Sequence, residues 1–356
     1  MKNLGELFET SLDKCICFSR LFIVPENPRL SVTPSFAGGG EDVRLSRTWF
    51  TPRSLERQWG AGNFAEPARS ADVTKTILIA ESGTPDHRAE RREDVGKSSG
   101  ETYAATLRQI MPGSAIEIVR PSDAGAAVMS AGEIARYDAV FITGSPMHVY
   151  NDTPPVRRQI GFMQAVFASG VPSFGSCAGL QVAVAAAGGT VRKMPERLEA
   201  GISRGIVRTP AGEGHPMLDG RPAVWDAPAL HGDEAERLPD GAVLLAGNRV
   251  TPIQAVEIRH GRGIFWGVQY HPELAIGEIA AALRREAEAL IEAGLAEGPD
   301  DVSDMADRLD DLHRDPDCRS CRWALGVDDE FAEEARRRTE LLNFIRAIPS
   351  LDRRGA

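Results

Sequence analysis

The chain has 356 residues, of which 42% are hydrophobic and 26% charged, and its formal net charge is −10. These proportions are typical of a globular protein with one large domain and extensions, or with two domains. The negative charge argues against a nucleic-acid partner, because binding to a phosphate backbone relies on Lys and Arg. No apolar run reaches the roughly 18–20 residues that a membrane span needs. We therefore expect a cytoplasmic protein that has no membrane or nucleic-acid partner.

The N-terminal residues 1–74 differ in composition from the rest of the chain. They mix Pro, Gly, Ser and Arg, and they show no sustained hydrophobic periodicity. We interpret this segment as an N-terminal extension, either disordered or produced by a start assigned too early. The first buried strand is predicted over Thr76–Ala80, a short apolar run rich in β-branched residues.

Residues 84–100 are polar and charged, and we predict a solvated loop there. Gly96-Lys97-Ser98 resembles the end of a phosphate-binding G-x4-G-K-S motif. However, Arg91 occupies the position of the first glycine, and no strand leads straight into the segment. We therefore expect no nucleotide here, and we assign no cofactor to the protein.

The next segments alternate between helix and strand. A helix is predicted over residues 101–110 and another from residue 154, with strands over 115–119, 139–143 and 171–174. This alternation predicts an α/β fold with a mainly parallel, flavodoxin-like sheet flanked by helices on both faces. Active sites in such sheets lie beyond the carboxyl ends of the strands.

The stretch over residues 171–189 is predicted to form a strand, a sharp turn and a helix, with Cys177 at the turn. Gly175 and Gly179 allow the backbone to bend tightly and the helix to pack close to the strand. A thiol in this position lies near the positive end of the helix dipole, which favours the nucleophilic thiolate. A small buried cysteine with no chemical role is the alternative.

Short strands follow over residues 242–246, 253–258 and 264–268, and they suit a partly antiparallel region that returns the chain to the same edge. The last of them leads to His271-Pro272-Glu273. A cysteine nucleophile needs a base, and the base needs a carboxylate or an amide to orient it. His271 and Glu273 could supply both.

The C-terminal part is predicted to be helical. An amphipathic helix over residues 276–293 is expected to pack on the sheet, and a helical C-terminal extension follows over residues 297–356. A helix near residues 328–346 would carry an apolar stripe that we expect to pack within the protein rather than bind a partner. That stripe consists of Phe331, Ala335, Leu342 and Ile345.

The remaining cysteines offer a possible metal site. His313, Cys318 and Cys321 have the spacing His-x4-Cys-x2-Cys, and a fourth zinc ligand would have to come from Cys15 or Cys17. This is not a common zinc-finger spacing. We therefore expect surface thiols and no metal.

Four segments carry a resemblance to a known family. Residues 175–181, GSCAGLQ, resemble the G-x-C-x-G-x-Q nucleophile motif of class I glutamine amidotransferases, and residues 267–273, GVQYHPE, resemble their G-V-Q-[FY]-H-P-E motif. Residues 141–152 look like the oxyanion loop of the GMP synthase branch, and His231-Gly232-Asp233 is similar to its H-G-D. Together these motifs lie within residues 76–295, and we take residues 75–296 as the domain.

The resemblance implies a role for each matched residue. Cys177 would be the nucleophile, His271 the base and Glu273 the residue that orients it. The backbone N–H groups of Ala178 and of the Gly144-Ser145 loop would stabilise the oxyanion, although the family has a second glycine where Ser145 stands. Gln181 would help to hold the substrate L-glutamine.

The resemblance also leaves three functions open. The first is a glutamine amidotransferase that hydrolyses L-glutamine to glutamate and ammonia; the chain has no S-G-G-x-D-S of an ATP-pyrophosphatase domain, so a separate synthetase subunit would accept the ammonia. The second is a γ-glutamyl hydrolase that acts on γ-glutamyl amines or peptides, against which the H-G-D counts. The third is a non-catalytic regulatory protein on the same scaffold. The H-G-D itself would serve communication with the synthetase or form a surface turn.

Overall fold

A computed structural model describes residues 75–195 and 198–352 of the chain. In chain order the strands are β1 (Thr76–Ala80), β2 (Ala115–Val119), β3 (Ala139–Ile142), β4 (Ser173–Ser176), β5 (Thr190–Lys193), β6 (Glu199–Arg208), β7 (Val224–His231), β8 (Asp233–Arg237), β9 (Ala242–Gly247), β10 (Ala255–His260) and β11 (Gly263–Val268). The helices are α1 (Pro85–Val95), α2 (Ser99–Ile110), α3 (Ala131–Ile134), α4 (Pro154–Ser169), α5 (Ala178–Ala186), α6 (Ile276–Arg285), α7 (Ala287–Glu292), α8 (Pro299–Arg314), α9 (Arg319–Leu325), α10 (Asp329–Ala332), α11 (Glu334–Arg337) and α12 (Thr339–Leu351), with a 3-10 turn at Pro216–Leu218.

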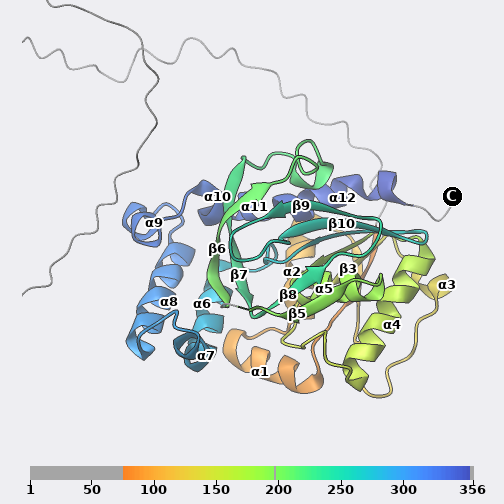
Figure 1. Cartoon of the computed structure of the whole chain (residues 1–356), viewed down its shortest axis with the longest axis horizontal. Coiled ribbons are helices and arrows are strands. Elements are labelled where there is room, and N and C mark those ends of the chain that lie inside the picture. The colour runs from red at the N-terminus through yellow and green to blue at the C-terminus, as the bar shows by residue number, and fades with distance from the viewer. Residues whose placement is uncertain (1–74, 196–197, 353–356) are drawn as a thin grey trace, which may run out of the picture. The chain divides into compact units, whose positions relative to one another are not determined.

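A nine-stranded sheet forms the centre of the structure, in the order β2-β1-β3-β4-β11-β10-β9-β6-β7 (Figure 1). The first five strands pair in parallel. The strands from β11 to β7 pair in antiparallel fashion. The predicted α/β fold is therefore confirmed, and so is the partly antiparallel return. Strands β5 and β8 form a separate two-stranded sheet.

Helices cover both faces of the parallel strands. Successive side chains of a strand point to opposite faces, and here the side chains on both faces are apolar and need cover. On β1, Ile77 and Ile79 pack into one hydrophobic cluster with residues of α2 and α12, whereas Leu78 and Ala80 pack into another with residues of α4 and α5. Figure 1 shows α12 and α4 on opposite sides of the sheet. In the part of the chain that the structure describes, no helix has the length and apolar character needed to cross a bilayer.

The predicted solvated loop over residues 84–100 is wrong, since α1 occupies most of it. This helix is specified by its ends and not by an apolar stripe. Thr84 and His87 form a capping box, Pro85 occupies the first turn, and Gly96 ends the helix in the left-handed conformation. Charged side chains dominate its length, so periodicity could not reveal it.

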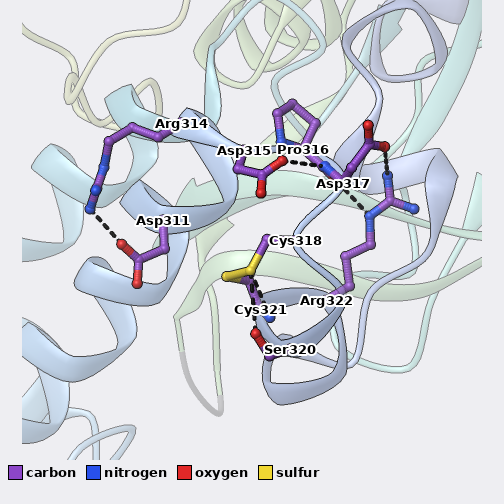
Figure 2. Close-up of a disulfide and its surroundings, with 9 residues drawn as sticks. All are labelled: Asp311, Arg314, Asp315, Pro316, Asp317, Cys318, Ser320, Cys321 and Arg322. Carbon is purple, nitrogen blue, oxygen red and sulfur yellow. Dashed lines mark hydrogen bonds and ion pairs between the residues drawn. A yellow bond between two sulfur atoms is a disulfide. The ribbon is translucent and has the colours of Figure 1, made fainter.

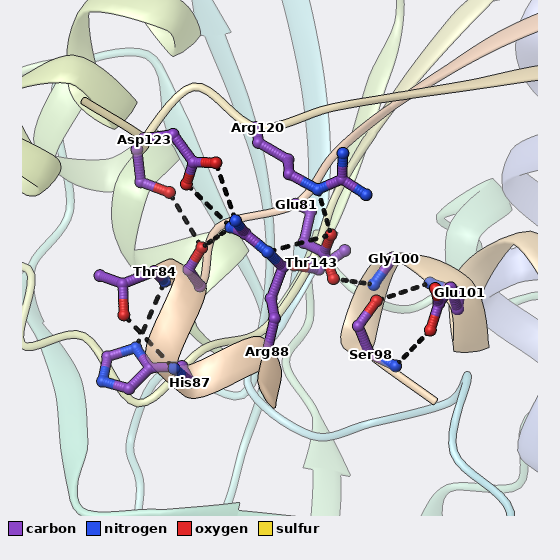
Figure 3. Close-up of polar contacts among 12 residues, drawn as sticks. Glu81, Thr84, His87, Arg88, Ser98, Gly100, Glu101, Arg120, Asp123 and Thr143 are labelled. Atoms are coloured by element: carbon purple, nitrogen blue, oxygen red, sulfur yellow. Dashed lines mark hydrogen bonds and ion pairs between the residues drawn. The ribbon is translucent and has the colours of Figure 1, made fainter. Parts of the chain in front are cut away.

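Charged contacts fasten α1 and α2 to the end of β1 (Figure 3). Arg88 of α1 donates two hydrogen bonds to the Asp123 carboxylate, at 2.9 and 2.7 Å, and one to the Gly83 carbonyl. The buried Glu81 carboxylate accepts a hydrogen bond from the first turn of α2, at the Gly100 N–H, at 2.8 Å. The end of β1 and the first turns of α1 and α2 are therefore held together by ion pairs and by a hydrogen bond to the start of a helix.

The C-terminal helices are shorter than predicted, because the chain interrupts them at additional positions. The expected helix over residues 276–293 divides at Glu286 into α6 and α7, and the expected helix over 328–346 becomes α10, α11 and most of α12. Of the predicted stripe, only Phe331 is fully buried, and Ala335 is exposed. The breaks shift the helical phase, so the residues that α12 buries against the sheet are Leu341, Phe344, Ile348 and Leu351. The helices thus pack within the protein, but mostly through residues other than those of the predicted stripe.

A buried arginine joins this C-terminal segment to the sheet. Arg221 donates hydrogen bonds to Glu330 at 2.8 Å and to Glu340 at 2.7 and 2.8 Å, and Tyr270 donates a further one to Glu340 at 2.8 Å. Removing one partner of a buried ion pair leaves the other charges without compensation.

We predict that Arg221→Leu lowers the free energy of unfolding by about 3–5 kcal/mol, because the buried Glu340 then loses its cation and Glu330 keeps only its pair with Arg336. Urea denaturation followed by circular dichroism measures this. The control is Arg284→Leu, which removes partly exposed ion pairs to Asp307 and Asp310 and should cost about 0–1 kcal/mol. Equal effects of the two substitutions would contradict the prediction.

Candidate active site

Cys177 lies at the junction between β4 and α5 in an unusual backbone conformation. Its φ of 52° is the one positive φ that a non-glycine residue adopts in the described part of the chain. Such a conformation costs about 1–3 kcal/mol and persists only where the surrounding structure imposes it. The Cys177 N–H donates to the Val268 carbonyl at 2.9 Å, which ties the turn to the end of β11. The expected sharp turn between strand and helix is confirmed.

Two glycines allow other segments to approach this turn closely. A Cβ atom on Gly179 would lie 2.4 Å from the Ile142 carbonyl oxygen, so only glycine lets α5 pack this close to β3. A Cβ atom on Gly144 would lie 2.9 Å from Cε1 of His271 and 3.5 Å from Cβ of Cys177. The loop after β3 therefore lies directly against the cysteine and the histidine.

His271 and Glu273 follow β11 and meet Cys177 at the carboxyl edge of the sheet. The Nδ1–H of His271 donates to Oε1 of Glu273 at 2.8 Å, and Cys177 and His271 both lie against Gly144. The His271 N–H donates to the Pro228 carbonyl at 2.8 Å, which fixes the backbone beneath the ring. All three side chains are buried. Residues separated by almost one hundred positions thus meet in one buried group.

The electrostatics of this group favour a charged imidazole. Burial by itself would lower the pKa of His271, but the Glu273 carboxylate and the Cys177 side chain beside it raise that pKa to about 10. At neutral pH the ring therefore keeps both protons and donates to the carboxylate. An imidazolium next to a thiolate is the arrangement that activates a cysteine nucleophile.

Two residues that the sequence analysis missed support Glu273. The Ser176 hydroxyl donates to Oε1 of Glu273 at 2.9 Å, and the Tyr103 hydroxyl, from α2, lies 2.6 Å from the Ser176 oxygen. Because the Ser176 proton is directed at the carboxylate, Tyr103 donates to Ser176. Burial raises the pKa of Tyr103 well above its usual value, so the phenol keeps its proton. Ser176 could have been noticed as the neighbour of Cys177, but nothing local in the sequence indicates Tyr103.

The predicted oxyanion residues border the same group. Ala178 is the first residue of α5, and the first N–H groups of a helix have no partner within it. The Ser145 hydroxyl accepts a hydrogen bond from the Met147 N–H at 3.2 Å, so it serves the turn of its own loop. Gly144 contacts the ring of His271, as described above. The oxyanion roles of Ala178, Gly144 and Ser145 stay predictions.

Gln181 lies in the first turn of α5, with both hydrogens of its amide engaged. Its Nε2 donates to the Asp233 carbonyl at 3.0 Å and to Oε1 of Gln269 at 3.2 Å. Its side chain is buried. The predicted contact with substrate therefore stays a prediction, and in this structure Gln181 connects α5 to β8 and to the end of β11.

The predicted free thiols of Cys318 and Cys321 are wrong, because the two residues form a disulfide at the start of α9 (Figure 2). The sulfurs bond to each other, since the helical turn brings residues three apart close together. His313 packs against Gly277 of α6 instead. Among the described residues no group of three or more His, Cys, Asp or Glu side chains could hold a metal ion. Cys15 and Cys17 lie outside the described residues.

We predict that Ser176→Ala slows alkylation of Cys177 by iodoacetamide roughly tenfold at neutral pH. The substitution removes one of two hydrogen bonds to the Glu273 carboxylate, and a hydrogen bond to a charged group contributes about 1.5–3 kcal/mol. Mass spectrometry of the Cys177 peptide over time measures the rate. The control is Ser173→Ala, a buried serine on the same strand whose hydroxyl bonds only the Ile264 carbonyl, at 3.4 Å. Equal rates in both variants would contradict a role for Ser176.

Comparison with solved structures supports the fold. A glutamine amidotransferase from Thermotoga maritima superposes with a TM-score of 0.53 at 15% identity, covering 77% of this chain and 98% of the other. A glutamine amidotransferase from Methylobacillus flagellatus superposes with a TM-score of 0.51 at 19% identity, covering 80% and 97%. At this level of identity the likeness concerns the fold alone.

Two curated relatives are similar in sequence. A γ-glutamyl-L-1-hydroxyisopropylamide hydrolase from a Pseudomonas species is 41% identical over 238 residues, which are 65% of this chain and 79% of the hydrolase. A glutamine-hydrolysing GMP synthase from Thiobacillus denitrificans is 36% identical over 146 residues, 38% of this chain and only 25% of the synthase. The family model described as glutamine amidotransferase class-I matches residues 93–287, more than half of the chain. This protein therefore belongs to the class I glutamine amidotransferase family.

Proposed function

We propose that this protein hydrolyses the γ-amide bond of a γ-glutamyl compound through a thioester on Cys177. The observation that carries the proposal is the buried group of Cys177, His271 and Glu273, in which Glu273 accepts a hydrogen bond from the imidazole that lies beside the cysteine. It combines a nucleophile, a proton carrier and an orienting carboxylate, which are the parts that acyl transfer requires.

The first half of the reaction follows from these positions. The Cys177 thiolate attacks the γ-carbonyl carbon, and the carbonyl oxygen becomes an oxyanion. The N–H of Ala178 and an N–H of the Gly144-Ser145 loop stabilise that charge, and losing one such donor raises a barrier by about 3 kcal/mol. The His271 imidazolium protonates the departing nitrogen, the C–N bond breaks, and the thioester remains.

In the second half of the reaction His271 acts as a base, whereas it acted as an acid in the first half. His271, now neutral, takes a proton from water, and the water oxygen attacks the thioester carbonyl. The C–S bond breaks, glutamate is released, and Cys177 regains its thiolate beside a protonated His271. Glu273 holds the imidazole in one orientation throughout.

For the leaving group we propose a free amine, so that the substrate is a γ-glutamyl amine. Support comes from the Pseudomonas relative, a hydrolase of a γ-glutamyl hydroxyisopropylamide that this chain matches over 79% of its length. The H-G-D segment counts against this activity. The hydrolase match outweighs that argument, because it covers 65% of this chain at 41% identity, whereas the GMP synthase match covers 38% at 36% identity.

The second candidate is hydrolysis of L-glutamine, with transfer of ammonia to a separate synthetase subunit. The similarity to the glutaminase portion of GMP synthases favours it. A non-catalytic role has weaker support, since it would leave the activated cysteine and its two partners without a use.

The test is release of glutamate from γ-glutamyl-isopropylamide and from L-glutamine by the purified protein. We predict a higher kcat/KM for the isopropylamide, and a decrease of at least about a thousandfold in Cys177→Ala. Wild-type activity that is higher on L-glutamine would favour the second candidate. No release from either compound by the wild type, or full activity in Cys177→Ala, would contradict the proposal.

The raised pKa of His271 gives a prediction about pH. The acid form of His271 is needed to protonate the leaving amine, so kcat should fall as the pH rises through about 10. Replacing the Glu273 carboxylate removes a charge that favours the imidazolium, so Glu273→Gln should move this decrease to lower pH. A pH profile of kcat, recorded for the wild type and for Glu273→Gln, measures the pH of this decrease in each protein. An unchanged profile in the variant would show that Glu273 does not set the pKa of His271.

A further inference from the structure

The His231-Gly232-Asp233 segment joins β7 to β8, and it is not a surface turn. His231 is 6% exposed and Asp233 8% exposed. Buried polar side chains need hydrogen-bond partners, and the partners here identify what the segment holds in place.

The Asp233 carboxylate contacts the loop that follows β3. Its Oδ2 lies 2.7 Å from Nδ1 of His148. The rings of His148 and Tyr150 lie against each other, with centroids 5.4 Å apart. Burial and the nearby Asp233 charge raise the pKa of Tyr150. Both aromatic residues belong to the same loop as Gly144 and Ser145, so one carboxylate on β8 holds a pair of stacked side chains of the loop that borders Cys177.

The backbone of Asp233 is held from the other side. Its carbonyl accepts hydrogen bonds from Nδ1 of His231 and from the Gln181 amide, both at 3.0 Å. The other ring nitrogen of His231 lies 3.1 Å from the Glu199 carboxylate on β6. Glu199 is itself buried and accepts further hydrogen bonds, from Ser203, Asn248, Thr251 and Gln254. The turn is thus attached to the sheet and cannot follow the loop if the loop moves.

We propose that Asp233 is a positioning residue that latches the 144–150 loop onto β8. Its carboxylate holds His148, against which Tyr150 packs, and His231 keeps Asp233 in place. The inference rests on the proposed function, because the latched loop is the one that would supply an oxyanion donor. The H-G-D segment then acts within the active site of this chain and needs no synthetase to have a role.

The kinetic test compares variants in the glutamate-release assay. Asp233→Ala removes the latch but leaves the backbone carbonyl that Gln181 and His231 hold. We expect kcat to fall about 10- to 100-fold, with KM within about threefold, because a displaced oxyanion donor weakens the transition state more than the bound substrate. His148→Ala should also lower kcat, and the double variant should lose less than the product of the two single losses. Asp233→Asn keeps an acceptor oxygen and should retain most activity.

The matched control is Asp307→Ala, which removes an exposed carboxylate of α8 that pairs with Arg284 and belongs to no part of the site. It should leave kcat and KM unchanged. A decrease in kcat for Asp307→Ala equal to that for Asp233→Ala would overturn the assignment, and so would additive losses in the double variant. If Asp233→Ala does not fold, His148→Ala still tests the latch, since 54% of the His148 side chain is exposed.

A second readout does not depend on activity. Hydrogen exchange, followed by mass spectrometry, should become at least tenfold faster for residues 144–150 in Asp233→Ala and in His148→Ala, and stay unchanged in Asp307→Ala. Unchanged exchange in the first two variants would overturn the latch even if the wild type is active. Faster exchange in a protein whose wild type releases no glutamate would support the latch and reject the proposed function.

Discussion

The Glu273 carboxylate lies beneath the His271 ring, in a place where a charge is costly unless hydrogen bonds and an opposite charge surround it. His271 and Ser176 both donate to its Oε1, and Thr106 of α2 donates to its backbone carbonyl at 3.2 Å. Segments from α2, β4 and the end of β11 therefore meet at one residue. The raised pKa of His271 depends on these contacts, because they hold in place the carboxylate that raises it.

Two further constraints shape the surroundings of that carboxylate. The positive φ of Cys177 directs its thiol toward the imidazole, and Gly179 lets α5 lie against β3 without a clash. On the opposite side, Asp233 connects the loop after β3 to β8. The cysteine is thus enclosed by a strained turn, a buried carboxylate and a loop that is fastened at a second point.

The sequence predicted the parallel strands and the residues around Cys177 well, because both depend on local patterns. Short β-branched runs such as Thr76–Ala80 and the small residues around Cys177 carry their structural meaning within a few positions. Helix α1 was missed since its caps, not its apolar residues, define it. The supports of Glu273 and the role of Asp233 could not be predicted, because Tyr103 and His148 reach their partners across 73 and 85 positions. Such contacts follow from topology, which periodicity does not encode.

The central claim is that the acyl group passes through the sulfur of Cys177, and trapping this intermediate tests it most directly. The protein is mixed with γ-glutamyl-isopropylamide, quenched in acid during turnover, digested and examined by mass spectrometry. The account predicts a γ-glutamyl adduct on the peptide that contains Cys177, which disappears when hydroxylamine cleaves the thioester. Steady release of glutamate with an unmodified Cys177 peptide at every quench time, in a protein whose Cys177→Ala variant turns over equally fast, would contradict it.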